Sequence, residues 1–248
     1  SSDLFLTGDE RLWLERRMKL EQPESEPKFM DELKILFHSV PFWIINIFGI
    51  VHLALFAVIM YWTTLMIEET YTSAEDEDDE TCASSKSTGL ASVIITSFVF
   101  ILSSLSTLAL GYVTDKGSNR SAISGWITAL CGVALASWAL TDYLDDDTGL
   151  VPLTIAACAM NAPTGLIVGL LVSHFDSHTK STALSVYATI VTLGALIGPI
   201  GIGAIVDHYG DYNVASVVLG SFGIAAGLLL LTVKDPLLQT NNHARHQV

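Results

Sequence analysis

Charged residues are missing from six long stretches of this sequence. Only 15% of the 248 residues are charged, against roughly 25% in soluble domains. The charge-free stretches are residues 41–67, 89–113, 121–140, 151–172, 182–206 and 214–233. A helix needs about 20 residues to cross a hydrocarbon core roughly 30 Å thick, and each stretch is long enough. A soluble protein with six such apolar helices is a poor alternative, so we expect an all-α membrane protein with six transmembrane helices.

Basic residues are also scarce, and their placement predicts an orientation. The chain has 12 Lys and Arg against 26 Asp and Glu, and 11 of the 12 basic residues lie in alternate stretches outside the apolar segments. Those stretches are residues 1–40, 114–120, 173–181 and 234–248. Basic loops stay in the cytoplasm, so both ends of this chain are expected there and the multi-pass protein lies in the lipid bilayer. We therefore divide the chain into a cytoplasmic linker with amphipathic helical stretches (1–40), a six-helix bundle (41–233) and a cytoplasmic tail (234–248).

The chain also lacks the residue patterns of catalysis. Its three cysteines and seven histidines show no metal-ligand spacing, and no phosphate-binding loop or hydrolytic triad is present. The loop Glu68–Glu80 holds eight carboxylates without the spacing of a calcium loop, and a solvated loop is the simpler interpretation. We expect no enzyme activity, no metal, no cofactor and no nucleic-acid partner.

A short motif occurs twice. The second apolar stretch ends Gly111-Tyr-Val-Thr-Asp115, and the fifth ends Gly203-Ala-Ile-Val-Asp207. The two copies are separated by three spans, so they face opposite sides of the membrane. This pattern predicts two inverted three-helix repeats, the construction of secondary transporters.

The first copy, Gly111-x-x-x-Asp115-Lys116-Gly117-Ser-Asn-Arg120, resembles the loop signature of the major facilitator superfamily. It departs from that signature by one missing residue after Lys116 and by a single base, Arg120, in place of a pair. The stretch 182–233 is similar to the last helix pair of that family, and the approach to Pro41-Phe42-Trp43 is similar to its central cytoplasmic linker.

The resemblance implies half of a twelve-helix major facilitator fold, namely the C-terminal half, with the N-terminal six-helix half as a missing partner. Within the family, Pro41-Phe42-Trp43 and the surroundings of Asp115 and Asp207 resemble the lysosomal dipeptide uniporter type. The membrane implied is therefore lysosomal or plasma membrane, and the substrate implied is a dipeptide or a similar small solute.

The loop signature also has a physical interpretation. A helix N-terminus carries about half a positive charge, and Asp115 is expected near the start of the fifth span, around Ser181 and Thr182. We therefore predict a conformational latch made of Gly111, Asp115, Lys116 and Arg120. The alternative is that Asp115 only caps a helix end while the basic residues only fix the topology.

Two features of the spans indicate a solute cavity. His52 lies eleven residues into the first span, near the midplane where transporter sites are found; a buried histidine bonded to another helix is the alternative. Pro163 lies in the middle of the fourth span, where it cannot donate to the Ala159 carbonyl and should kink the helix.

Small polar residues form stripes on the second and fourth spans. The predicted cavity residues are His52, Thr96, Ser103, Thr107, Asn161 and Thr164. Close helix packing is the other interpretation of such stripes. Gly194, Gly198 and Gly201, around Pro199, are predicted to serve helix packing and bending rather than ligand binding.

These observations favour transport of a small organic solute by alternating access. Uniport is favoured because no Asp or Glu lies within the spans to relay protons. The alternatives are a non-transporting membrane scaffold or accessory subunit and a channel subunit, although no loop resembles a pore loop. A carrier predicts an open groove lined by His52, Thr107 and Asn161, whereas a scaffold predicts that these side chains are satisfied in closed packing.

Overall fold

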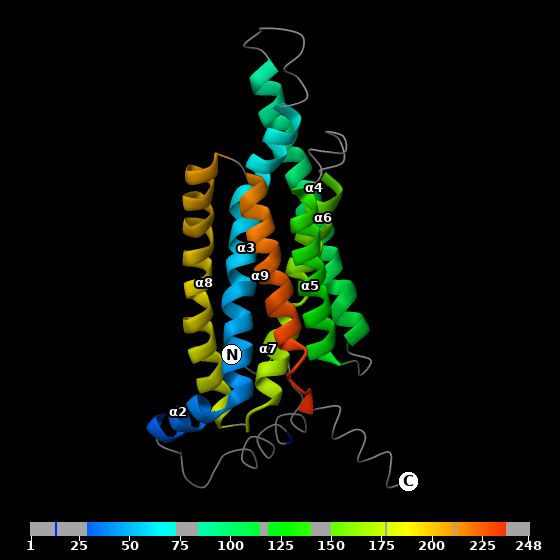
Figure 1. Cartoon of the computed structure of the whole chain (residues 1–248). Coiled ribbons are helices and arrows are strands. Elements are labelled where there is room, and N and C mark those ends of the chain that lie inside the picture. The colour runs from blue at the N-terminus through cyan, green and yellow to red at the C-terminus, as the bar shows by residue number, and fades with distance from the viewer. Residues whose placement is uncertain are drawn as a thin grey trace, which may run out of the picture.

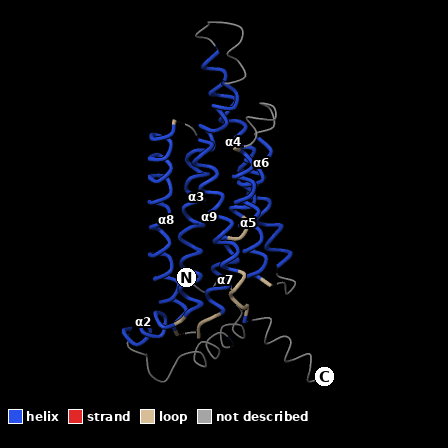
Figure 2. Tube along the Cα trace, in the orientation of Figure 1, coloured by secondary structure: helices blue, strands red, loops and turns tan. Residues whose placement is uncertain are grey.

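The computed structural model describes residue 13 and residues 29–72, 84–114, 119–139, 150–176, 178–210 and 212–236. This part of the chain forms helices joined by turns, and it contains no strand (Figure 2). The helices are α2 (Phe29–His38), α3 (Val40–Thr72), α4 (Ser84–Thr114), α5 (Arg120–Trp138), α6 (Leu150–Asn161), α7 (Thr164–Ser173), α8 (Thr179–Tyr209) and α9 (Tyr212–Leu230).

Six segments of these helices are long and apolar enough to cross a membrane. They are Val40–Leu65, Ser92–Thr114, Arg120–Trp138, Leu150–Ser173, Thr179–Tyr209 and Tyr212–Leu230. Each matches one of the charge-free stretches, and the fourth comprises α6 and α7 together. The all-helical fold with six spans is thus confirmed. The span limits could be predicted because burying a charged residue in lipid costs free energy.

Glycines bring α5 and α9 into backbone contact. A Cβ atom at Gly132 would lie 2.4 Å from the carbonyl oxygen of Gly220, and a Cβ atom at Gly220 would lie 2.4 Å from that of Gly132. Gly125 and Gly227 oppose each other in the same way, at 2.7 and 2.5 Å. Small residues drive helix association in lipid by permitting such close approach, so these two pairs hold α5 against α9.

The helix pairing follows the two predicted repeats. The first repeat is α3, α4 and α5, and the second is α6–α7, α8 and α9. The contact between α3 and α8 is equivalent to that between α6 and α4. The contact between α3 and α9 is equivalent to that of α6 and α7 with α5. α5 and α9, which are equivalent to each other, also pack together. In Figure 1, α4 ends at the bottom of the bundle and α8 ends at the top. The inverted construction predicted from the doubled motif is confirmed.

Burial differs strongly among the spans. In α4 and α8 only 17% of the apolar window is buried inside the bundle, whereas the other spans reach 44–56%. These two helices are equivalent in the two repeats, and they stand at opposite edges of the bundle in Figure 1. Most of their surface is therefore available to lipid or to another helical body.

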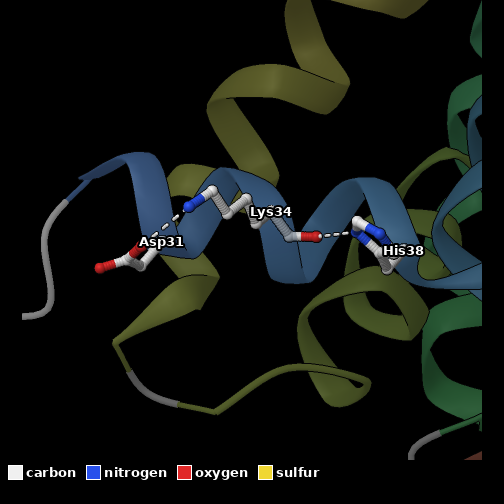
Figure 3. A network of polar contacts seen from close by, with 3 residues as sticks. All are labelled: Asp31, Lys34 and His38. Atoms are coloured by element: carbon white, nitrogen blue, oxygen red, sulfur yellow. Dashed lines mark hydrogen bonds and ion pairs between the residues drawn. The ribbon is translucent and has the colours of Figure 1, made fainter.

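α2 lies across the end of the bundle from which α3 starts (Figure 1). Its exposed side carries an ion pair between Lys34 and Asp31 at 3.5 Å, and His38 Nδ1 bonds the Lys34 carbonyl at 2.8 Å (Figure 3). Surface pairs of this kind add little stability. Its attachment to the bundle comes instead from Leu36, which is fully buried in an apolar cluster with α3, α7, α8 and α9. Glu32 adds a hydrogen bond that it accepts from the Thr182 hydroxyl of α8 at 2.5 Å.

Candidate functional site

The fourth span is interrupted where the sequence predicts a kink. α6 ends at Asn161, Ala162 and Pro163 form a turn, and α7 begins at Thr164. Pro163 has no N–H group, so the Ala159 carbonyl lacks its regular donor four residues on. Regular helical hydrogen bonding is thus interrupted inside the membrane-crossing segment.

His52 lies beside this break. It sits twelve residues after the start of the span Val40–Leu65 and thirteen before its end, and it is 4% exposed. Its ring stacks on Phe48 with the ring centroids 5.5 Å apart. Its Nε2 is 3.4 Å from the Thr164 hydroxyl of α7, and its Nδ1 has no hydrogen-bond partner among the described residues. The structure therefore brings together two of the predicted cavity residues, from α3 and α7.

A second polar contact joins α4 to α6 just before the break. The Ser103 hydroxyl donates to the Ala157 carbonyl at 2.9 Å, and the Asn161 amide donates to the same oxygen at 3.2 Å. The Ser106 hydroxyl reaches the next carbonyl, that of Cys158, at 3.0 Å. Sequence reasoning missed Ser106, although its spacing of three from Ser103 places both on one helix face.

The remaining predicted cavity residues bond within their own helix. The Thr107 hydroxyl donates to the Ser103 carbonyl at 3.1 Å, and the Thr96 hydroxyl donates to the Ser92 carbonyl at 2.7 Å. Because His52 is 4% exposed, it does not line an open groove with Thr107 and Asn161 among the described residues. Closed packing does not satisfy all three side chains either, since His52 Nδ1 remains without a partner among the described residues.

Grooves do occur between the helices, with other linings. One of about 440 Å³ lies between α4, α5 and α6, and its polar members are Ser106, Thr154 and Cys158. Another, of about 220 Å³ and apolar throughout, lies between α3, α8 and α9. The six predicted cavity residues line neither of these two grooves.

The predicted latch is only partly within the described residues. Gly111 lies near the end of α4 with open space beside it, whereas Asp115 and Lys116 lie outside the described residues. The backbone N–H of Arg120 donates to Asp235 Oδ2 at 3.1 Å, and its guanidinium lies over Gly169 of α7. Asp235, which follows α9 and is 3% exposed, was not singled out from the sequence.

The helix ends that the predicted latch would join lie apart. The latch required the end of α4 to lie beside the start of α8, near Ser181 and Thr182. Figures 1 and 2 place α4 and α8 at opposite edges of the bundle, with α3 and α9 between them. Thr182 instead donates to Glu32 of α2. A pairing inside this chain is therefore unsupported, and a role for Asp115 stays a prediction.

The glycines of α8 lie against the backbone of α3. A Cβ atom at Gly194 would lie 2.0 Å from the Ile50 carbonyl oxygen, and one at Gly198 would lie 2.7 Å from that of Ala54. Gly194 and Gly198 thus pack closely, whereas a Cβ atom at Gly201 would have no neighbour within 4 Å. Pro199 lies inside α8, which continues through it as one helix from Thr179 to Tyr209.

The sequence matches the model of a known protein family. The family model described as Major Facilitator Superfamily matches residues 79–247, well over half of the chain. No curated protein matches the sequence. The match begins before α4 and runs past α9, so it includes the doubled motif and the interrupted fourth span. The chain belongs to the major facilitator superfamily, a family of membrane transporters.

Proposed function

We propose that this chain is the C-terminal half of a carrier that moves a small organic solute across the membrane by alternating access. The observation that carries the proposal is the interrupted span beside His52. A broken helix with an incompletely bonded polar side chain at mid-depth is costly in lipid, and it is tolerated where it lines a cavity. α3 and α6–α7 would then form half of the solute cavity.

The partner in this proposal is an N-terminal six-helix half of the same transporter. Its docking face would be formed by α4 and α8, because these spans leave most of their surface uncovered. Alternating access requires two bundles that rock against each other. α5 and α9, held together by their glycine pairs, would be supporting helices on the other side.

We extend the proposal to the transport mode, the substrate and the membrane. Uniport is favoured because the six charge-free stretches contain no Asp or Glu for a proton relay, and Asp207 lies only in the last turn of α8. A dipeptide substrate and a lysosomal membrane come only from the resemblance around Pro41-Phe42-Trp43. We keep them as the first substrate class and the first membrane to test.

The test is solute uptake into liposomes. The whole carrier, with an N-terminal six-helix bundle joined to this chain, is compared with this chain alone and with empty liposomes, using labelled dipeptides and amino acids. We expect saturable uptake by the whole carrier and none by this chain alone. A whole carrier that binds solute without moving it would favour the non-transporting scaffold, and saturable flux through the monomeric chain alone would contradict the two-bundle mechanism.

A further inference from the structure

An apolar groove of about 220 Å³ lies between α3, α8 and α9. Its floor is α3, where the backbone at Ile50 and Ala54 lies against Gly194 and Gly198 of α8. Gly201, farther along α8, also lines the groove, and a Cβ atom there would have no neighbour within 4 Å. α8 and α9 thus leave a space above α3 that the described side chains do not fill.

This groove opens where the spans meet the bilayer. Ile197 of α8 and Phe222 of α9 line it, and they are 61% and 58% exposed. His52 follows Ile50 by two residues, which is about 200° around α3, and its ring meets Thr164 of α7 instead. The groove is therefore separate from the solute site proposed above. It lies within membrane-crossing segments, so its surroundings are hydrocarbon.

A second groove lies at the end of the bundle where α8 begins. It has a volume of about 450 Å³ and lies between α8 and α2, which crosses this end of the bundle in Figure 1. Phe29 and Phe37 of α2 form one side of it. Its α8 side begins with the hydroxyl groups of Ser181 and Ser185 and ends at Ile190, toward the middle of the span. The lining is thus richest in hydroxyl groups at the end of the bundle.

The two grooves follow one face of α8. Ile190 lines the groove beside α2, and Ile197 and Gly201 line the groove beside α9. Their spacings of seven and four residues place all three on one side of a helix. Ser185 precedes Gly194 by nine residues, so the polar part of one groove and the start of the other are about 14 Å apart along α8. One leaflet contributes half of a hydrocarbon core roughly 30 Å thick, about 15 Å, so an acyl chain that starts beside Ser185 reaches the second groove.

We propose that these two grooves hold one phospholipid of the leaflet on the α2 side. Its glycerol and ester groups lie between α2 and α8, where the exposed Ser181 hydroxyl can donate to an ester carbonyl. One of its acyl chains lies in the groove between α3, α8 and α9. The polar and apolar linings follow each other along α8 in the same order as the polar and apolar parts of such a lipid.

The exposed side of α2 supports this placement. Phe29 and Met30 are 60% and 63% exposed. An amphipathic helix at a membrane surface buries its apolar face at the boundary of headgroups and acyl chains, which is the level of the ester groups. A sterol matches less well, because its polar part is a single hydroxyl group, whereas the hydroxyl-lined region extends over a helix turn, from Ser181 to Ser185.

Photochemical labelling after removal of the surrounding lipid tests this site. The carrier is reconstituted in vesicles of equal parts phosphatidylcholine and phosphatidylglycerol, with a small share of phosphatidylcholine that carries a diazirine near the end of one acyl chain. It is then extracted in detergent, washed and irradiated, and the labelled peptides are identified by mass spectrometry. We expect label in the peptides of α8 and α9 that contain Ile197 and Phe222. Absence of label there in the wild-type protein would overturn the proposal.

Variants locate the lipid in the grooves. Gly201→Leu places a side chain in the groove beside α9 and should lower the labelled fraction about tenfold, equivalent to about 1.4 kcal/mol. Gly111→Leu is the matched control and should keep the label, because a Cβ atom at Gly111 of α4 also has no neighbour within 4 Å and that residue lines neither groove. Full labelling of Gly201→Leu, with an unchanged unfolding midpoint, contradicts the site. If Gly201→Leu lowers that midpoint, Ser181→Val decides instead: reduced labelling supports the site, and full labelling contradicts it.

Other occupants of the grooves give distinct results. A diazirine-bearing cholesterol analogue that labels the same peptides, and that excess phospholipid does not displace, would assign the grooves to a sterol and contradict the proposal. An N-terminal half that covers the groove beside α9 would leave the wild-type peptides unlabelled by either lipid, which also contradicts it. Neither result depends on solute uptake, so the lipid site is tested separately from the proposed transport.

Discussion

Individual glycines decide how closely the spans approach one another. Gly194 and Gly198 place the backbone of α8 on the carbonyl oxygens of Ile50 and Ala54. In lipid, where no hydrophobic effect drives helices together, such contact supplies much of the attraction. Gly201, three residues farther along α8, has no such neighbour. Glycines in one helix therefore have different structural roles, and substitution distinguishes them.

The substitution Gly194→Ala should destabilise the bundle. Its Cβ atom would lie 2.0 Å from the Ile50 carbonyl oxygen, so α3 and α8 must separate. Overpacking of this kind typically costs about 1–3 kcal/mol. The measurement is the midpoint of thermal unfolding in detergent, with Gly201→Ala as the control that should leave it unchanged. Equal midpoints for both variants would mean that α3 and α8 do not pack as described.

The fourth span is interrupted, whereas the fifth is one continuous helix. Both contain a proline, yet Pro163 separates α6 from α7 while Pro199 lies within the continuous α8. Around the first break, α4 supplies hydroxyl donors to the carbonyls of Ala157 and Cys158. The carbonyl that Pro163 frees is that of Ala159, and Cys158 still accepts from the Ala162 N–H at 3.3 Å. The α4 hydroxyls therefore fasten α6 to α4 beside the break.

Pro163→Ala should restore a continuous fourth span. The new N–H could donate to the Ala159 carbonyl, which removes the helix end beside His52 and favours the straight helix by up to about 3 kcal/mol. We expect a raised thermal midpoint and a several-fold loss of solute uptake in liposomes, because the site and its bending point are lost. Pro199→Ala, the matched control in α8, should keep uptake. If Pro163→Ala takes up solute at the wild-type rate, transport does not need the break.

The sequence predicted the spans and the break better than the contacts between spans. Span limits depend on charge and length, and the effect of Pro163 depends on its missing N–H, so both are local properties. Which carbonyl Ser103 bonds, and whether Thr107 faces another helix or its own backbone, depends on helix rotation and pairing. The separation of α4 from α8 is likewise a property of the assembled bundle.

At the scale of the whole molecule, the distribution of basic residues predicts an orientation for the inverted repeats. α5 and α8 begin, and α9 ends, at the end of the bundle where α2 lies (Figure 1). Arg120 is the first residue of α5, Lys180 the second of α8, and Lys234 follows α9. Basic loops are retained in the cytoplasm during insertion. The α2 end is therefore expected inside, and the loop between α3 and α4 is expected outside or in a lumen.

Cysteine labelling checks this orientation. Cys131→Ala with Cys158→Ala leaves Cys82, between α3 and α4, as the only thiol of the chain. In host cells with the protein in the plasma membrane, an impermeant maleimide should label this thiol on intact cells. Adding Cys82→Ser and His178→Cys moves the thiol to the exposed turn between α7 and α8, where labelling should require permeabilised cells. The variant lacking all three cysteines is the control, and the reverse accessibility of the two thiols would show that the positive-inside assignment is wrong for this chain.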